Sequence, residues 1–264
     1  ISDEVVESKT KEFMAQGETE AKATEKAYAV AENVEQGLLN QKARVVLVLD
    51  RSGSMEDEYD QGLLNGIASK SVATGLQFDD DGEVEVYLFA NNAKKLPQTM
   101  NTSNFFEYID TVVHAKNPGM FGSYVHQFGG TEYAPIINLL VTDYGGTKGS
   151  VQDIPTFVIF ITDGENSDQS AAKSAITKAA DYPIFFQFIG VDSKHKGGGL
   201  MSEAEAHSSF PFLSQLDDLE GRTYDNADFF AVKGFEAFDK PAILMAMMNE
   251  FPGWLNAVRG KLIK

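Results

Sequence analysis

The chain contains no cysteine and only four histidines among its 264 residues. The lack of thiols excludes disulfide bonds, cysteine-ligated zinc and thiol catalysis. No two histidines stand at the spacing of a metal-binding pair, so we interpret all four as structural or surface groups. They are His114, His126, His195 and His207.

Positive charge is also scarce. The 22 Lys and Arg residues face 39 Asp and Glu residues, which gives a formal net charge of −17. Because nucleic acids and anionic membranes bind clustered Lys and Arg, the composition disfavours both as partners. No apolar run approaches the roughly 20 residues that a membrane-spanning helix needs, and the first residues do not resemble a signal peptide. We therefore expect a soluble, cytoplasmic protein.

Hydrophobic residues, in contrast, are plentiful: they make up 43% of the chain and include 19 phenylalanines, which is ample material for a core. Residues 1–41 contain no proline, and their apolar side chains recur on one helical face from Ala23 to Leu38. We expect a helical N-terminal extension over residues 1–41 that packs on the main domain. The alternative is a separate partner-binding arm. Residues 42–264 are expected to form the main domain, including a C-terminal helix.

From Arg44 onward, strand-like runs alternate with helical stretches, which is typical of βαβ units and an α/β fold with a mostly parallel sheet. Three runs are almost continuously apolar, as parallel strands buried on both faces are. These runs are Val45–Asp50, Thr156–Asp163 and Pro183–Val191. We expect further strands at Glu83–Ala90 and Arg222–Val232, and helices at Gln61–Gln77, Asn104–Val113, Tyr133–Thr142, Gln169–Ala180 and Lys240–Leu262.

The segment VVLVLDRSGSM joins the first of these strands to a turn with three oxygen-bearing side chains. Asp50 ends the strand, and Ser52 and Ser54 follow at alternate positions. Open α/β sheets bind ligands at the carboxyl ends of their strands. Carboxylate, hydroxyl and water oxygens are the ligands that magnesium prefers. The segment therefore predicts part of a magnesium site.

Two other segments add oxygen donors to this edge of the sheet. Thr131 follows Gly129 and Gly130 in a loop before a helix, and Asp163 ends the second apolar strand. Three of the five donors are neutral hydroxyls, so they would leave a divalent ion incompletely neutralised. Such an ion would favour an external carboxylate as its sixth ligand, which is binding chemistry rather than bond-breaking chemistry.

These residues resemble the metal-ion-dependent adhesion site of von Willebrand factor A domains, over roughly Arg44 to Lys264. A narrower likeness is to the bacterial tellurium-resistance (TerF-type) branch, carried by segments such as Phe78–Gly82, Ile161–Gly164 and Glu250–Pro252. The resemblance implies a Rossmann-like sheet flanked by helices and a bound Mg²⁺, with Mn²⁺ and Ca²⁺ as alternatives. It also implies the metal-binding residues, which are Asp50 and Asp163, acting partly through water, and Ser52, Ser54 and Thr131, coordinating more directly.

Arg51 departs from the family pattern, because many relatives carry a small or apolar residue there. We expect its charge to guide an acidic partner, and we expect Gly130 to contact the partner as well.

The leading functional hypothesis is a non-catalytic module that uses its metal to bind an Asp or Glu of a partner protein, in bacterial tellurium or metal-stress resistance. The first alternative is a magnesium-dependent phosphoryl-transfer or hydrolytic enzyme with Asp50 as nucleophile. Against it, Ser52 stands where a second acid would be needed, and the sequence shows no convincing general base. The second alternative is a structural subunit whose loops the metal only stiffens.

Overall fold

The computed structural model describes residues 42–78, 82–117, 123–194, 199–234 and 246–264, and a few positions before residue 42. The expected N-terminal extension, residues 1–41, thus lies almost entirely outside the described residues. Ala23 and Ala27 of its apolar face are described, and both are helical and buried. The packing of this segment as a whole stays a prediction.

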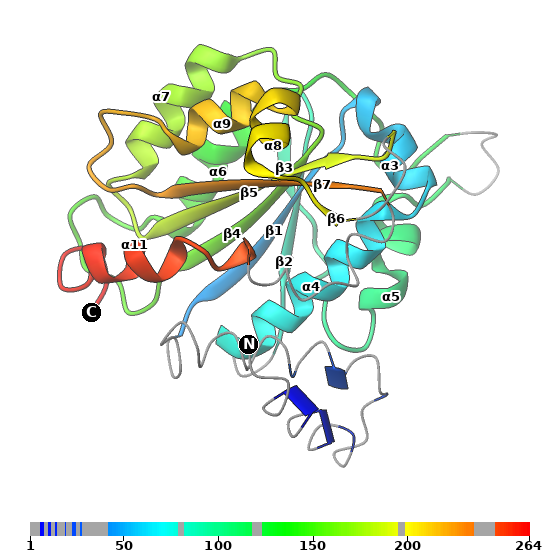
Figure 1. Ribbon diagram of the computed structural model, residues 1–264, viewed down its shortest axis with the longest axis horizontal. Coiled ribbons are helices and arrows are strands. Elements are labelled where there is room, and N and C mark those ends of the chain that lie inside the picture. Colours follow the sequence, from blue (N-terminus) through cyan, green and yellow to red (C-terminus); the bar gives the residue numbers. More distant parts are fainter. Residues whose placement is uncertain are drawn as a thin grey trace.

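A seven-stranded sheet in the order β3-β2-β1-β4-β5-β7-β6 forms the centre of the fold (Figure 1). The five strands from β2 to β7 in this order run parallel, and β3 and β6 lie antiparallel at the two edges. The predicted α/β fold with a mostly parallel sheet is therefore confirmed. The strands are β1 (Arg44–Asp50), β2 (Glu85–Phe89), β3 (Ala93–Lys95), β4 (Thr156–Thr162), β5 (Ile184–Asp192), β6 (Gly199–Leu200) and β7 (Ala227–Lys233).

Helices cover both faces of the sheet (Figure 1). One face packs against α3 (Glu56–Asp60), α4 (Leu63–Phe78), α5 (Phe105–Tyr108) with the π-helical turn Ile109–Val113 that follows it, and α11 (Phe251–Val258). The other face packs against α6 (Ala134–Tyr144), α7 (Gln169–Ala179), α8 (Glu203–Ser209) and α9 (Pro211–Asp217).

The continuous apolar run of β1 follows from this arrangement. Val45, Leu47 and Leu49 belong to one core cluster, whereas Val46 and Val48 belong to the other. All five side chains are at most 1% exposed. Burying an aliphatic side chain of this size contributes about 1.5–3 kcal/mol to the free energy of folding. The side chains on both faces of β1 therefore favour a place for this strand in the middle of the sheet. The strand consequently delivers Asp50 to the carboxyl edge of the sheet.

The C-terminal part differs in detail from the expected helix at Lys240–Leu262. Ala246 and Met247 are helical, a turn follows, and α11 begins at Phe251. Pro252 lies in the first turn of α11, where a missing N–H leaves no helical bond unmade. Residues 235–245 lie outside the described part of the chain, so the start of the expected helix stays a prediction.

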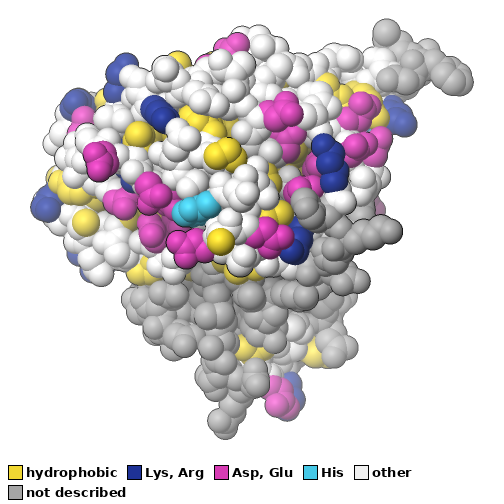
Figure 2. All heavy atoms as spheres, turned by 45° about the horizontal axis from the view of Figure 1, so that its top comes forward, with side chains coloured by type: hydrophobic (Ala, Val, Ile, Leu, Met, Phe, Trp, Pro, Cys, Tyr) yellow, Lys and Arg dark blue, Asp and Glu magenta, His cyan; other side chains and the backbone are white. Residues whose placement is uncertain are grey.

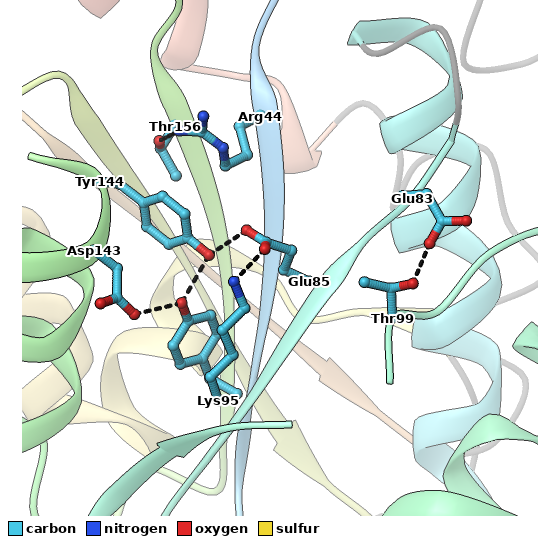
Figure 3. Close-up of polar contacts among 9 residues, drawn as sticks. Arg44, Glu83, Glu85, Lys95, Thr99, Asp143, Tyr144 and Thr156 are labelled. Atoms are coloured by element: carbon cyan, nitrogen blue, oxygen red, sulfur yellow. Dashed lines mark hydrogen bonds and ion pairs between the residues drawn. The ribbon is translucent and has the colours of Figure 1, made fainter. Parts of the chain in front are cut away.

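Side-chain hydrogen bonds fix the β2 edge of the sheet against α6 (Figure 3). The Tyr87 hydroxyl donates to the Asp143 carboxylate at 2.7 Å and lies 2.7 Å from the Tyr144 hydroxyl. Tyr144 in turn donates to Glu85, which also pairs with Lys95 of β3. The β2–β3 hairpin is thereby held in place, and its loop carries Asn91 towards the carboxyl edge.

No described helix is both long and apolar enough to span a membrane.

Candidate metal centre

Three loops meet at the carboxyl edge of the sheet and are joined by backbone hydrogen bonds. The loop after β1 pairs with the loop before α6 through a parallel bridge between Ser52 and Gly129. The Gly53 N–H donates to the Gly129 carbonyl at 2.9 Å, and the Gly129 N–H donates to the Arg51 carbonyl at 3.1 Å. The first and second segments of the predicted site therefore lie side by side.

Asp50 lies beneath these loops and is fully buried. One carboxylate oxygen accepts the Ser52 N–H at 2.8 Å, and the other accepts the Thr162 hydroxyl at 2.6 Å. Burial raises the pKa of Asp50 to about 7, and the nearby charge of Asp163 adds to the rise, whereas the hydrogen bonds oppose it. Among the described residues no cation pairs with this carboxylate. A bound cation would favour its ionised form.

The three hydroxyl residues belong to the two loops that the Ser52–Gly129 bridge joins. The Ser52 and Ser54 hydroxyl oxygens are 3.1 Å apart. Ser52 is buried, whereas Ser54 and Thr131 line a cavity of about 610 Å³. Gly130, Glu165 and Asn166 line the same cavity, and Pro211 and Phe212 form an apolar part of its wall. The cavity therefore gives a ligand access to two of the five predicted metal-binding side chains.

The two glycines before Thr131 allow this loop to approach the β2–β3 hairpin closely. The Gly130 N–H donates to the Asn91 side-chain oxygen at 2.7 Å. A Cβ atom on Gly130 would lie 2.6 Å from the Asn91 side-chain nitrogen, and one on Gly129 would lie 3.0 Å from the Ala90 Cβ. Larger residues would thus displace Asn91 or the loop.

The third loop, after β4, holds the second loop in place. Asp163 is partly buried there, and one of its carboxylate oxygens accepts the Glu165 N–H at 3.2 Å. Ser167 donates to the Thr131 carbonyl with its N–H at 2.9 Å and its hydroxyl at 2.7 Å. The Asp168 carboxylate accepts the first N–H groups of the α6 segment, from Tyr133 and Ala134, each at 2.8 Å.

Sequence reasoning did not identify the residues that support the five donors. Thr162 is 112 residues from Asp50, and Asp168 is 34 residues from Ala134. No local pattern connects positions so far apart. The structure places four of the predicted donors in the three adjoining loops and Asp50 at the end of β1. It adds Asn91, Thr162 and Asp168 as residues that position them.

Arg51 does not occupy the position that we expected. Its side chain is 2% exposed, and its guanidinium carbon lies 3.7 Å from the centre of the Phe128 ring. Tyr59 and Tyr124 flank it at 4.5 and 5.1 Å. Its Nε donates to the His126 carbonyl at 3.0 Å. Direct guidance of an acidic partner by Arg51 is therefore wrong for this arrangement, because the charge lies inside an aromatic cluster. Gly130 is exposed, and its contact with a partner stays a prediction.

The donor set fits a hard divalent cation. Asp50 and Asp163 supply carboxylates, Ser52, Ser54 and Thr131 supply hydroxyls, and all five therefore offer oxygen. The buried, cation-free carboxylate of Asp50 is the structural observation that most favours an ion at this point.

Comparison with known proteins gives one family match and one similar bacterial protein. The model for the von Willebrand factor A domain found at the C terminus of TerF matches residues 42–264. The uncharacterized protein YcbR of Bacillus subtilis (strain 168) is 30% identical over 219 residues, which are 83% of this chain and 80% of YcbR.

Solved structures resemble the chain at low sequence identity. Proximal thread matrix protein 1 from the mussel byssus has 16% identity and a TM-score of 0.49, over 79% of this chain and 48% of its own. The manganese-loaded TRAP protein of Plasmodium vivax has 14% identity and a TM-score of 0.48, over 81% of this chain and 74% of its own. The chain spans about half the length of the mussel protein. Because the family model matches residues 42–264, the chain belongs to the von Willebrand factor A domains of the type found at the C terminus of TerF.

Proposed function

We propose that the chain is a non-catalytic protein-interaction module. It holds Mg²⁺ at the carboxyl edge of its sheet and binds an Asp or Glu of a partner protein as the sixth ligand. Mn²⁺ and Ca²⁺ are the alternative ions. The metal-binding residues in this proposal are Asp50, Ser52, Ser54, Thr131 and Asp163.

The observation that carries the proposal is the position of the cavity. Ser54 and Thr131 line it, and the buried Asp50 carboxylate lies beneath the same loops. Two carboxylates offer formal charge equal to that of a divalent ion. Contacts made through water would leave part of the ion's charge uncompensated. A carboxylate from a partner would supply the missing charge. Pro211 and Phe212 would offer an apolar contact to the partner side chain that stands next to this carboxylate.

The geometry favours binding over nucleophilic catalysis. Asp50 is 0% exposed, and both of its carboxylate oxygens accept hydrogen bonds, from the Ser52 N–H and the Thr162 hydroxyl. A nucleophilic carboxylate needs a free oxygen within reach of the substrate. We therefore expect no hydrolysis of phosphate esters or acyl phosphates in the presence of Mg²⁺. Turnover that disappears in Asp50→Ala would contradict this part of the proposal.

Partner capture tests the module directly. The immobilised chain is exposed to lysate of its native host with Mg²⁺ or with EDTA, and bound proteins are identified. Thr131→Ala should abolish Mg²⁺-dependent capture. Thr142→Ala makes a matched control, because it removes an exposed hydroxyl of α6 that donates to the Asn138 carbonyl at 2.9 Å, within the same helix and outside the three loops. In a captured partner, replacing the contacting acid by its amide should release it.

The same experiment separates the module from a subunit that the metal only stiffens. In that case capture would persist in EDTA and in Thr131→Ala, while the thermal midpoint fell when the ion was removed. Capture that is unchanged by chelation would therefore sink the proposal, even if the ion binds and stabilises the loops.

We also propose a role in bacterial tellurium or metal-stress resistance, which the TerF family supports. A host strain that lacks the gene should grow poorly on tellurite. Complementation by the wild type, but not by Thr131→Ala, would connect the metal site to resistance. Equal rescue by both would separate the two.

A further inference from the structure

A second group of carboxylates lies near the first residues of β7, which is three strands away from β1 in the sheet. It consists of Asp217 at the end of α9, Asp228 on β7 and Glu250 just before α11. One carboxylate oxygen of each lies within 4.8 Å of the other two. Three segments that are separate in sequence thus bring three acids to one point, and Figure 2 shows acidic side chains grouped on the face that carries α8 and α9.

These three acids lack a matching positive charge. Among the described residues, none of the three forms an ion pair. Arg222 lies nearby, but its Nε donates to the Leu219 carbonyl at 2.8 Å and its Nη2 pairs with Asp225 at 2.5 Å. Its charge therefore offsets the group only partly.

Electrostatics agrees with this geometry. Burial, as the larger cause, and repulsion from neighbouring acids, as the smaller one, raise the pKa of Asp217 to about 8 and the pKa of Glu250 to about 7. Burial also raises the pKa of Asp228 to about 6, although the neighbouring Gln187 amide opposes that rise. Without a cation, the neutral, protonated form of each of the three acids is thus favoured.

An independent observation is the side chain of Gln187. Gln187 stands on β5 in register with Asp228, so that the two side chains are neighbours on the same face of the sheet. It is 0% exposed, and neither atom of its amide makes a hydrogen bond of normal geometry with any described residue. A buried polar group without a partner costs about 1–3 kcal/mol. If a cation lay between the carboxylates, the amide oxygen could coordinate it and would no longer lack a partner.

We propose that Asp217, Asp228 and Glu250 form a second divalent-cation site, completed by the Gln187 amide oxygen, and that it takes Ca²⁺. Calcium accepts six to eight oxygens in irregular geometry, including carboxylates and amide carbonyls, whereas magnesium demands a near-ideal octahedron. A cavity of about 600 Å³ adjoins the acids and is lined also by His207 and Phe229, which gives an ion and its water ligands access.

The second site is distinct from the first in space. Asp228 is in register with Gln187, Gln187 with Ile159, and Ile159 with Leu47, three residues before Asp50. Three strands at about 4.8 Å and three residues at about 3.3 Å place the sites about 17 Å apart. Trp254, the sole tryptophan of the chain, lies one helical turn after Glu250 in α11. It is therefore a local reporter of the second site.

The test is terbium luminescence of the whole chain after removal of metals with EDTA. Tb³⁺ replaces Ca²⁺ at oxygen sites and emits when a nearby excited tryptophan transfers energy to it. Excitation at wavelengths that tryptophan alone absorbs should give a saturable emission that Ca²⁺ displaces. Asp228→Asn and Glu250→Gln should each weaken Tb³⁺ binding by about tenfold or more, since each removes a ligand charge.

Two control variants make the result specific. Asp163→Ala, in the first metal centre, should leave the tryptophan-sensitised emission unchanged. Asp218→Asn removes an exposed acid next to Asp217 and should change the affinity far less than Asp228→Asn does. Circular dichroism checks that Asp228→Asn is folded; if it is not, Glu250→Gln decides. Emission that Ca²⁺ fails to displace, or that survives in the folded variants, overturns the second site.

Discussion

At the scale of single residues, the candidate site is held together by side chains that are not among its five candidate metal ligands. Arg51 is the clearest case, because it joins the loop after β1 to the segment 123–131 through the rings of Tyr124 and Phe128 and the His126 carbonyl. It also lies over the Tyr59 ring of α3. Its sequence position, beside Asp50, suggested a contact with the partner. The aromatic residues that surround it lie up to 77 residues further along the chain, so the sequence alone could not reveal that the charge is buried.

Arg51→Ala should therefore destabilise the protein and weaken metal binding together. We expect a loss of about 2–4 kcal/mol in the free energy of unfolding, because a large buried side chain and its cation–π contacts disappear. Urea unfolding followed by circular dichroism measures it. Arg51→Met keeps most of the volume without the charge, and it should recover part of the loss. A variant Arg51→Ala as stable as the wild type would show that the aromatic cluster does not depend on the guanidinium.

The grouping of the five candidate donors at one edge of the sheet could be predicted from sequence. Asp50, Ser52 and Ser54 follow an apolar strand directly, and parallel topology brings Asp163 to the same edge. The resemblance to von Willebrand factor A domains supplied Thr131, and the family match confirms that membership. The supporting contacts from Asn91, Thr162 and Asp168 could not be predicted, because they are made between loops and leave no periodic pattern.

At the scale of elements, long apolar runs were predicted well and short elements poorly. The three buried strands β1, β4 and β5 lie where their continuous apolar runs indicated. β3 and β6 have three and two residues, too few to show a pattern. α8 and α9 were missed as well, although Ser202 and Glu205 have the spacing of a capping box and Pro211 stands at the start of α9.

Helix α6 offers a test at this scale, because its first N–H groups depend on Asp168. Asp168→Ala should cost about 1–2 kcal/mol in the free energy of unfolding, since the N–H groups of Tyr133 and Ala134 lose their acceptor. Mg²⁺ affinity should fall with it, because Thr131 precedes this turn. Urea unfolding and calorimetric titration with Mg²⁺ measure the two effects.

Asp153→Ala is the matched control for this variant. Asp153 is 77% exposed and, among the described residues, its ion pair is with Lys264, so its removal should change the free energy of unfolding by less than about 1 kcal/mol. Equal losses in the two variants would contradict the capping role of Asp168.

At the scale of the whole molecule, an excess of negative charge is concentrated at two points of one sheet. The buried Asp50 lies at one of them, with Asp163 nearby, and Asp217, Asp228 and Glu250 share the other. Raised pKa values at both points mean that the folded chain binds protons that the unfolded chain has released, in the range from about pH 4 to about pH 8. Stability from this source is therefore present at low pH and is lost as the pH rises.

In EDTA, the free energy of unfolding should consequently fall more steeply with rising pH in the wild type than in Asp228→Asn. The variant has one titrating acid fewer, and its amide relieves repulsion that also involves Asp218, Asp225 and the partly compensating Arg222. Urea unfolding at several values between about pH 5 and about pH 8 gives the two slopes. Saturating Ca²⁺ should flatten the wild-type slope. Identical slopes for both proteins would show that Asp228 titrates normally.

The C-terminal residues have a practical consequence for the geometry of attachment. The Leu262 carbonyl accepts the Gln152 N–H at 2.8 Å and the Lys264 N–H donates to the Gln152 carbonyl at 3.0 Å, just before β4 begins. β4 then runs seven residues, about 23 Å, towards the loops of the metal centre. A surface or fusion partner linked through Lys264 thus holds the chain at the end of β4 that is opposite to these loops; Figure 1 marks this end of the chain with a C, beside α11. C-terminal coupling is accordingly the orientation in which an immobilised chain can capture its ligand.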